Sequence, residues 1–278
     1  MSSILVTCRL VTRGLRRAAS VLLALAFGAL AAQPAAAGPV EARVRASGTL
    51  RVCIWPDYVG ITYRHPQTRV MSGIDIDLSG ELARDLKLRL EYVDSSFATL
   101  IADVQGDRCD VAMFAVGRLP QRMEHLRFTR PYLASDIYGI TTKGSRVVRS
   151  WEDIDKPGVQ VAVQAGTFME PVMRERLKQA QLVLVKPPAV RERELQAGRV
   201  DVFMTDYPYS HGLMENADWA VRLAPPKPFF VLPYAYAVKP GDDAWLKTVD
   251  QFVERIQRDG RLKDAAARHG LSPIVAAP

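Results

Sequence analysis

The stretch Gly73-Ile-Asp-Ile-Asp-Leu-Ser-Gly-Glu-Leu-Ala-Arg-Asp-Leu-Lys-Leu-Arg-Leu-Glu-Tyr-Val93 decides the fold class of this chain. Leu78, Leu82 and Leu86 recur at helical spacing with charged residues between them, and acidic residues stand at the start. This pattern predicts an amphipathic helix. Residues 88–93 then predict a β-strand. A helix and a strand in direct succession are the unit from which α/β folds are built.

Strands and helices alternate on both sides of this stretch. Residues 50–54 predict a strand that ends in the turn at residues 55–58. Residues 95–104 predict a second helix, and residues 110–114 predict a third strand. Such alternation is typical of a parallel sheet, whose binding sites gather at the carboxyl ends of the strands.

The alternation restarts after Trp151, which predicts a second lobe. Strands and helices are expected in turn at residues 159–163, 168–178, 182–185, 191–196 and 198–204. A strand at 234–238 and helices at 243–258 and 262–268 then close the chain and are expected to pack on the first lobe. We predict an α/β protein of two lobes, each a mostly parallel sheet flanked by helices, joined by two hinge crossings. Lobe 1 comprises residues 38–133 plus 234–278, and lobe 2 comprises residues 134–233.

The N-terminus has the three parts of a secretory signal peptide. Arginines precede an apolar run at residues 18–32, and Ala35, Ala36 and Ala37 precede Gly38. We expect residues 1–37 to be cleaved and the protein to be exported to the periplasm. A retained membrane anchor is the alternative, but the apolar run is shorter than the ~20 residues that a spanning helix needs.

Composition and charge narrow the function classes. The chain has 48% hydrophobic and 24% charged residues, as globular proteins do. The predicted signal peptide carries four arginines and no acidic residue, which is more than half of the formal charge of +7. The remaining basic residues are dispersed, so we expect no nucleic-acid partner. The four histidines are isolated and no phosphate-binding loop is present, so we expect no metal and no cofactor.

Two cysteines remain after the predicted cleavage, Cys53 and Cys109. An oxidising compartment permits a disulfide between them. Two reduced residues buried in neighbouring strands are the alternative.

Several short motifs, in this order and spacing, resemble the family 3 extracellular solute-binding proteins. They are Gly48-Thr-Leu-Arg-Val52, Gly73-Ile-Asp-Ile-Asp-Leu78, Gly106-Asp-Arg-Cys-Asp-Val111, Pro120-Gln-Arg122, Phe128-Thr-Arg-Pro-Tyr132, Gly198-Arg-Val-Asp201 and Asp259-Gly260. The resemblance implies the type II periplasmic binding fold, whose two lobes close around a solute as a Venus flytrap does. It also implies a monomer without enzymatic activity that captures an amino acid or related small carboxylate for the permease of an inner-membrane ABC transporter.

The resemblance also assigns a ligand clamp. Arg122 aligns with the arginine that holds the ligand α-carboxylate, and Asp206 aligns with the acid that receives the α-ammonium group. A guanidinium suits a carboxylate because it can donate two parallel hydrogen bonds. Without the alignment, the arginine is interpreted as a loop residue and the aspartate as a turn former.

One departure from the family lies beside the predicted clamp. Leu119 replaces a threonine that binds the carboxylate in many members, and Arg118 adds a second positive charge. An acidic ligand held by both arginines is one interpretation, and a weaker carboxylate contact is the other.

Four further residues are predicted to touch ligand. Trp55 and Tyr58 follow the first strand, where the family places an aromatic side chain against the ligand; core packing is the alternative. Gly166 and Thr167 stand at the start of a helix, where backbone N–H groups favour an anion; a plain helix cap is the alternative.

Two other functions remain as alternatives. Cyclohexadienyl dehydratases resemble these binding proteins and need a general acid, for which Glu170 is the candidate. Accessory proteins of quinoprotein dehydrogenases have similar cysteine-bearing strands, but Asp206 argues for amino acid binding instead.

Overall fold

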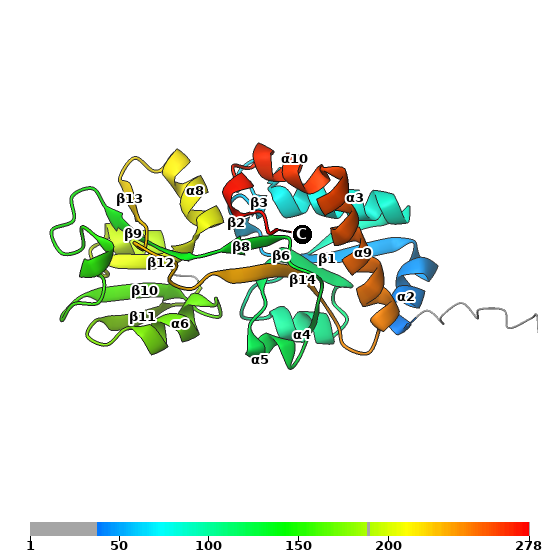
Figure 1. Ribbon diagram of the computed structural model, residues 1–278, viewed down its shortest axis with the longest axis horizontal. Coiled ribbons are helices and arrows are strands. Elements are labelled where there is room, and N and C mark those ends of the chain that lie inside the picture. Colours follow the sequence, from blue (N-terminus) through cyan, green and yellow to red (C-terminus); the bar gives the residue numbers. More distant parts are fainter. Residues whose placement is uncertain (1–37, 188–189, 278) are drawn as a thin grey trace, which may run out of the picture. The chain divides into compact units, whose positions relative to one another are not determined.

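The computed structural model describes residues 38–187 and 190–277 of the chain. The predicted signal peptide, residues 1–37, lies outside the described residues. Two mixed sheets dominate the fold (Figure 1). We call the first sheet, together with the small sheet that follows β1 and the helices and loops that contact them, the first lobe, and the second sheet with its helices and loops the second lobe.

The first sheet has the order β5-β1-β6-β14-β7, and β8 also pairs with β14. Its strands are β1 (Thr49–Ile54), β5 (Arg89–Asp94), β6 (Val111–Gly117), β7 (Arg127–Phe128), β8 (Leu133–Ser135) and β14 (Leu232–Val238). β1 runs parallel to β5 and β6, whereas β14 runs antiparallel to β6, β7 and β8. A small separate sheet, β2 (Asp57–Tyr58), β3 (Thr62–Arg64) and β4 (Met71–Ser72), follows β1.

The second sheet has the order β11-β10-β12-β9-β13. Its strands are β9 (Ile137–Thr142), β10 (Gln160–Gln164), β11 (Gln181–Val185), β12 (Val202–Asp206) and β13 (Ala220–Leu223). β10 runs parallel to β11 and β12, and β9 runs antiparallel to β12 and β13.

The chain crosses between the sheets twice, as the sequence predicts. It leaves the first sheet after β8 to enter β9, and it returns from β13 to β14. The prediction that each sheet is mostly parallel is wrong in detail, because β9 and β14 run against their neighbours. These strands arrive directly from the other sheet rather than through a crossover helix, which is the connection that makes consecutive strands parallel. The predicted lobe boundaries fall inside β8 and β14 and stay a prediction.

Helices cover both sheets. Those of the first lobe are α2 (Pro39–Ser47), α3 (Ile74–Leu86), α4 (Leu100–Gln105), α5 (Pro120–Met123), α9 (Asp243–Asp259) and α10 (Arg261–Arg268). Those of the second lobe are α6 (Met169–Arg176), α7 (Arg191–Gln196) and α8 (Tyr207–Asn216), and short 3-10 turns occur at Trp151–Asp153 and Ser272–Ile274. α9 contacts β14 and α10 contacts α3, so the C-terminal helices pack on the first lobe as predicted.

Two helix predictions need correction. No element is predicted in the segment before β1, but this segment forms α2, which has Pro39 in its first turn and ends at the left-handed Gly48. The helix predicted at 95–104 begins only at Leu100. The hydroxyls of Ser96 and Thr99 each accept the other residue's backbone N–H at 3.2 Å, and such side chain-to-backbone bonds compete with helix formation.

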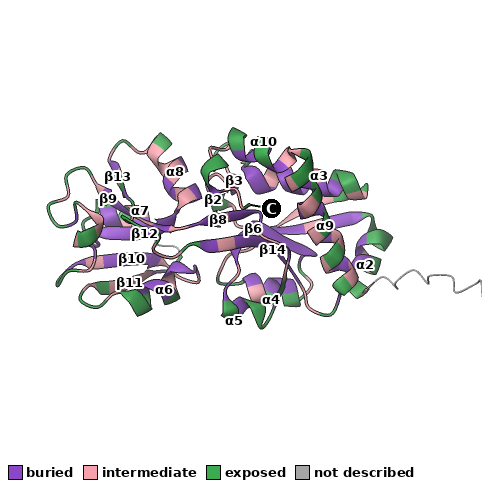
Figure 2. Ribbon diagram, viewed as in Figure 1, coloured by how far each residue is buried: buried purple, intermediate pink, exposed green. Residues whose placement is uncertain are grey.

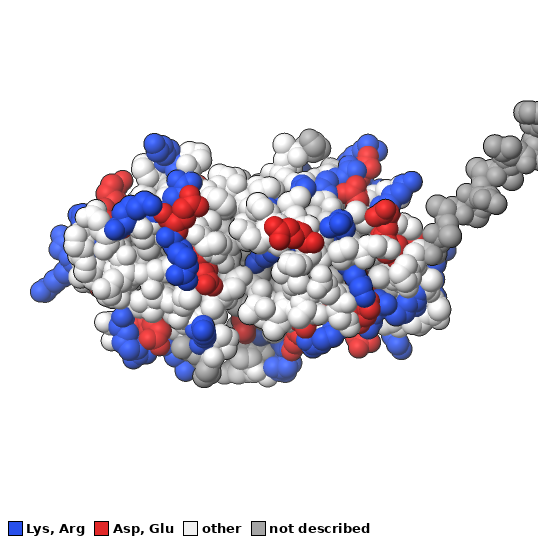
Figure 3. All heavy atoms as spheres, turned by 90° about the horizontal axis from the view of Figure 1, so that it is seen from below, with Lys and Arg blue, Asp and Glu red and all other residues white. Residues whose placement is uncertain are grey.

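The buried residues form the centres of the two sheets (Figure 2). In β6 every residue is buried, and β12 is buried throughout. The structure joins Cys53 of β1 to Cys109, which precedes β6, through a disulfide with a Cα–Cα distance of 5.5 Å. On the surface, basic and acidic side chains lie beside one another (Figure 3).

Candidate functional site

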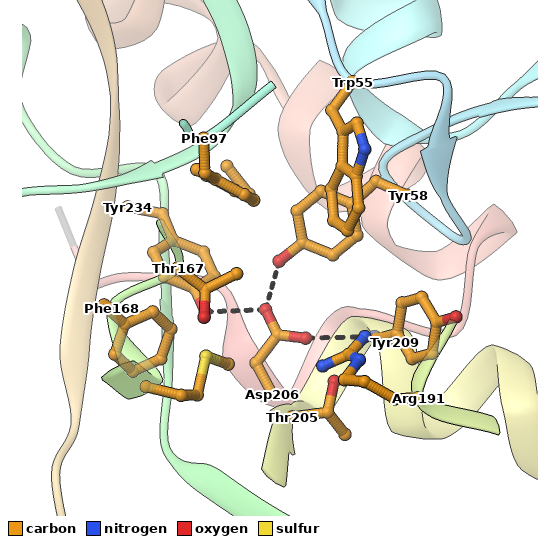
Figure 4. A pocket seen from close by; sticks show the side chains of 12 residues that line it. Trp55, Tyr58, Phe97, Thr167, Phe168, Arg191, Thr205, Asp206, Tyr209 and Tyr234 are labelled. Carbon is orange, nitrogen blue, oxygen red and sulfur yellow. Dashed lines mark hydrogen bonds between the residues drawn. The ribbon is translucent and has the colours of Figure 1, made fainter. Parts of the chain in front are cut away.

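One pocket lies where the carboxyl ends of strands from both lobes meet (Figure 4). It is mainly aromatic and also holds one acid and one arginine. Its lining residues are Trp55, Tyr58, Phe97, Ala115, Thr167, Phe168, Met169, Arg191, Thr205, Asp206, Tyr209 and Tyr234. The cavity volume is about 20 Å³, far below the ~300 Å³ or more of sites that enclose small molecules. The two lobes are therefore closed on one another in this structure.

Asp206 is the acid of this pocket. It is the last residue of β12 and the N-cap of α8, and its side chain is buried. One carboxylate oxygen accepts hydrogen bonds from the hydroxyl groups of Tyr58 and, at 2.7 Å, Tyr234. The other oxygen accepts the backbone N–H of Tyr209 at 3.2 Å. Burial raises the pKa of Asp206, and these hydrogen bonds offset part of that rise.

The two tyrosines link the lobes. Tyr58 in β2 and Tyr234 in β14 belong to the first lobe, whereas Asp206 ends a strand of the second sheet. Burial holds the pKa of both tyrosines well above the ordinary value. Both hydroxyls are therefore neutral donors at physiological pH, and each bond to Asp206 favours the closed arrangement of the lobes.

Aromatic rings form the wall beside Asp206. The ring centres of Trp55 and Tyr58 are 5.3 Å apart, and Phe97 lies 5.4 Å from Trp55 and 5.9 Å from Tyr58. Phe168 of the second lobe packs against Tyr234 from the other side, with a centre distance of 6.2 Å. The predicted residues Trp55 and Tyr58 thus line the pocket, whereas Phe97 and Phe168 were not predicted.

Arg122 is buried next to the pocket but does not line it. Its guanidinium nitrogens donate to the backbone carbonyls of Gly117 at 3.2 Å and Gly166 at 3.1 Å. Its Cζ lies 5.2 Å from the ring centre of Phe97. Burial lowers the pKa of Arg122 to about 10, so it stays charged at neutral pH. In this closed structure Arg122 ties a carbonyl of the first lobe to one of the second, and its contact with a ligand stays a prediction.

Arg191 is the cation that lines the pocket, and the sequence analysis did not select it. It is the first residue of α7 and is buried. Its guanidinium lies 5.0 Å from the ring centre of Phe203 and 4.7 Å from that of Tyr209, and one nitrogen donates to the carbonyl of Met204 at 2.9 Å. Its position in the sequence indicates a residue of the binding site, because a helix that follows a parallel strand begins at the edge of the sheet where ligands bind.

Two other predicted residues belong to the turn after β10. Thr167 lines the pocket, but its hydroxyl donates to the carbonyl of Gln164 at 2.7 Å, a local turn contact. Gly166 has a φ of +80°, and its N–H donates to the carboxylate of Glu170 at 3.0 Å. Its carbonyl accepts the bond from Arg122.

Arg118 and Glu170 do not line the pocket. The backbone N–H of Arg118 donates to the carbonyl of Pro233 at 3.0 Å. Glu170 lines a different hollow together with Pro171, Arg174 and Glu175. The acid that the dehydratase hypothesis names is therefore placed outside the pocket.

A second buried acid, Asp75, is hydrogen-bonded to the backbone of the pocket. Asp75, expected to be a helix-start residue, does lie in the first turn of α3, but its side chain is fully buried. It accepts hydrogen bonds from Tyr132 at 2.5 Å, Tyr236 at 3.1 Å and the N–H of Ala115 at 2.9 Å. Ala115 lines the pocket with a left-handed φ of 51°, so Asp75 holds a strained backbone position of the site.

Within residues 38–187 and 190–277, no cluster of acidic, histidine or cysteine side chains has the arrangement of a metal site. In the same described part of the chain, no helix combines the length and the apolar character that crossing a membrane demands.

Known proteins resemble this chain along most of its length. The cyclohexadienyl dehydratase of Pseudomonas aeruginosa is 29% identical over 252 residues, which cover 90% of this chain and 92% of the relative. The ABC transporter glutamine-binding protein GlnH of Bacillus subtilis is 24% identical over 202 residues, covering 71% and 72%. Among solved structures, an ancestral amino acid-binding protein described as a precursor of cyclohexadienyl dehydratase is 27% identical with a TM-score of 0.74, covering 82% of this chain and 97% of that one.

The family assignment rests on a match to a family model. Residues 50–272 match the family model described as bacterial extracellular solute-binding proteins, family 3. The match includes both sheets, both crossings and every residue that lines the pocket. The chain belongs to family 3 of the bacterial extracellular solute-binding proteins.

Proposed function

We propose that this protein is exported to the periplasm, captures a small amino-acid-like solute between its lobes and delivers it to the permease of an ABC transporter. The observation that carries the proposal is the Asp206 carboxylate, buried in an aromatic pocket and held there by hydroxyl groups of the other lobe. The predicted signal peptide, the lobe boundaries and the monomeric state belong to the same proposal.

The hydrogen bonds of Asp206 explain how a solute could be recognised. The hydroxyls of Tyr58 and Tyr234 donate to one oxygen of this carboxylate. A ligand ammonium group can take the place of such donors and adds a charge, which makes the hydrogen bond stronger. Because the cavity is about 20 Å³, the lobes have to separate before a solute enters. The ligand then favours closure only through contacts that exist in the closed form.

The relatives support an amino-acid-like ligand. GlnH is a glutamine-binding protein, and another relative at 22% identity is the L-cystine-binding protein of Escherichia coli. The placement of Glu170 outside the pocket supports binding rather than dehydration. We therefore propose no catalytic role, and the presence of Asp206 in the pocket favours amino acid binding over an accessory role in a redox complex.

A thermal-shift screen tests the proposal. The protein from Gly38 onward is unfolded and refolded to remove bound solute, then screened against the common amino acids and small carboxylic acids. A compound present at a hundred times its Kd should stabilise the protein by ~2.7 kcal/mol. No shift with any compound would contradict the proposal.

The variant Asp206→Asn tests whether the solute binds at this site. Loss of one partner of a buried charged contact costs ~2–5 kcal/mol, so we expect the affinity for an amino acid to fall at least about thirtyfold. Asp57→Asn is the matched control, because Asp57 is exposed and adjoins Tyr58 in β2. Equal affinity of both variants would show that Asp206 does not contribute to solute binding.

A further inference from the structure

Arg191 brings a positive charge to the pocket that a clamp of Arg122 and Asp206 does not require. Its side chain is only 4% exposed, similar to the 6% of Arg122 and the 2% of Asp206. Among the described residues, the side chain of Arg191 donates a hydrogen bond to the backbone carbonyl of Met204 and none to a carboxylate. Arg191 is therefore a buried cation without a carboxylate partner in this part of the chain.

The two carboxylates near Arg191, those of Asp206 and Glu192, accept hydrogen bonds from other groups. Asp206 already accepts hydrogen bonds from Tyr58, Tyr234 and the N–H of Tyr209. The nearby Glu192 accepts the hydroxyl of Tyr209 at 2.8 Å and does not line the pocket. Arg191 donates one hydrogen bond to a carbonyl, so its other N–H groups can bind an anionic group of a solute.

The cost of burying an unpaired charge makes this arrangement informative, because a buried charge is expensive unless it is paired. A clamp of Arg122 and Asp206 would use both charges of a zwitterionic solute and leave Arg191 without a carboxylate partner. A solute with a second carboxylate would supply that partner. A cationic side chain would be repelled by Arg191, although one solved structure with a TM-score of 0.64 and 27% identity is described as an ancestral cationic amino acid solute binding protein.

The other residues that line the pocket indicate what kind of carbon skeleton the solute has. Trp55, Phe97, Phe168 and Met169 present apolar surface, and the guanidinium of Arg191 lies against the ring of Tyr209. Such a wall suits an apolar or ring-bearing carbon skeleton. Arg191 fixes where the second acid group must point, because it enters the pocket from α7 of the second lobe, beside Asp206 (Figure 4).

We propose that the solute is a small dicarboxylic acid with a net negative charge, and that Arg191 binds its second carboxylate. This inference rests on the proposed function of solute capture and names the chemical class of the solute. Arg191 thus determines specificity, selecting acidic solutes over neutral ones of the same shape.

Pairs of compounds that differ by one carboxylate test the inference. L-glutamate is compared with L-glutamine, and phenylsuccinate with 3-phenylpropionate, by calorimetric titration of the refolded protein. A charged hydrogen bond gained in a buried site corresponds to an affinity gain of at least about tenfold. We expect that gain for the dicarboxylate in at least one pair. Arg191→Gln should abolish the preference, and Arg191→Lys, which keeps the charge, should retain part of it.

Arg222→Gln is the matched control. Arg222 also lies between two aromatic rings of the second lobe, 5.4 Å from each of Tyr138 and Tyr207, and it does not line the pocket. This variant should keep the preference of the wild type.

The possible results distinguish failure of the dicarboxylate inference from failure of the proposed solute capture. Absence of a tenfold gain for the dicarboxylate in both pairs with the wild type would overturn the inference and leave solute capture intact. A preference for dicarboxylates that survives in Arg191→Gln would overturn the role of Arg191. Binding of no amino acid or carboxylic acid would overturn the proposed function and the inference with it. The wild-type comparison decides the solute class even if the Arg191 variants fail to fold.

Discussion

Replacing Gly166 with alanine should weaken solute binding, whereas the same replacement at Gly198 should not. Both glycines have a left-handed backbone, with φ values of +80° and +69°. Alanine in such a conformation costs ~1 kcal/mol at either position. This strain is present in the open and the closed protein alike, so it lowers stability but cancels from the binding constant.

The two positions differ in what a Cβ atom would meet. At Gly198 it would meet nothing within 4 Å, whereas at Gly166 it would lie 2.9 Å from the backbone N and Cα of Ala98. Ala98 belongs to the first lobe and Gly166 to the second, so the contact exists only when the lobes are closed. Ordinary contacts begin at 3.4 Å, and a backbone atom cannot rotate away as a flexible side chain can.

The cost of this crowding should appear in the affinity. Overpacking of a close contact costs ~1–3 kcal/mol, which corresponds to binding about 5- to 150-fold weaker. Calorimetric titration of both variants with the tightest compound from the screen measures the difference. Equal affinities of Gly166→Ala and Gly198→Ala would refute closure of Gly166 onto Ala98 as part of binding.

Two further predictions concern stability. Burial raises the pKa of Asp75 to about 7 from 3.8, so the folded state binds the proton more tightly and Asp75 should destabilise the protein increasingly as pH rises from about 4 to 7. Asp75→Asn should remove this loss, and urea unfolding of both proteins at pH 5 and 8 should show the variant gaining relative stability at pH 8; a pH-independent difference would contradict the assignment. The disulfide between Cys53 and Cys109 spans 56 residues, and the double variant Cys53→Ala, Cys109→Ala should lose about 4 kcal/mol of unfolding free energy. A denaturation midpoint equal to that of the oxidised wild type would contradict the stabilising role.

Much of the fold follows from local patterns in the sequence. The apolar runs and leucine spacings predicted β1, β5, β10, β11, α7, α9 and α10 close to their observed bounds. The direction of β9 and β14 was not predictable from these patterns, because it depends on how the chain crosses between sheets. The proline and glycine at the two ends of α2 were helix signals that the sequence analysis did not use.

The site was only partly predictable, for physical reasons. Asp206 and Tyr58, which the resemblance implied as ligand residues, both line the pocket, and their contact with a ligand stays a prediction. Tyr234 lies in a predicted strand, but no local pattern reveals that its hydroxyl meets Asp206 of the other lobe. Arg191 was overlooked because arginines are mostly exposed, and only the fold shows that aromatic rings and a carbonyl cover this one.

The most direct test of solute capture is calorimetric titration of the refolded protein with the tightest compound from the screen, followed by chemical analysis of the mixture. Solute capture predicts saturable binding of one molecule per chain and recovery of the compound unchanged after prolonged incubation. Conversion of the compound to a product would contradict it and establish an enzyme on this scaffold. Absence of heat with every amino acid and carboxylic acid would contradict it as well.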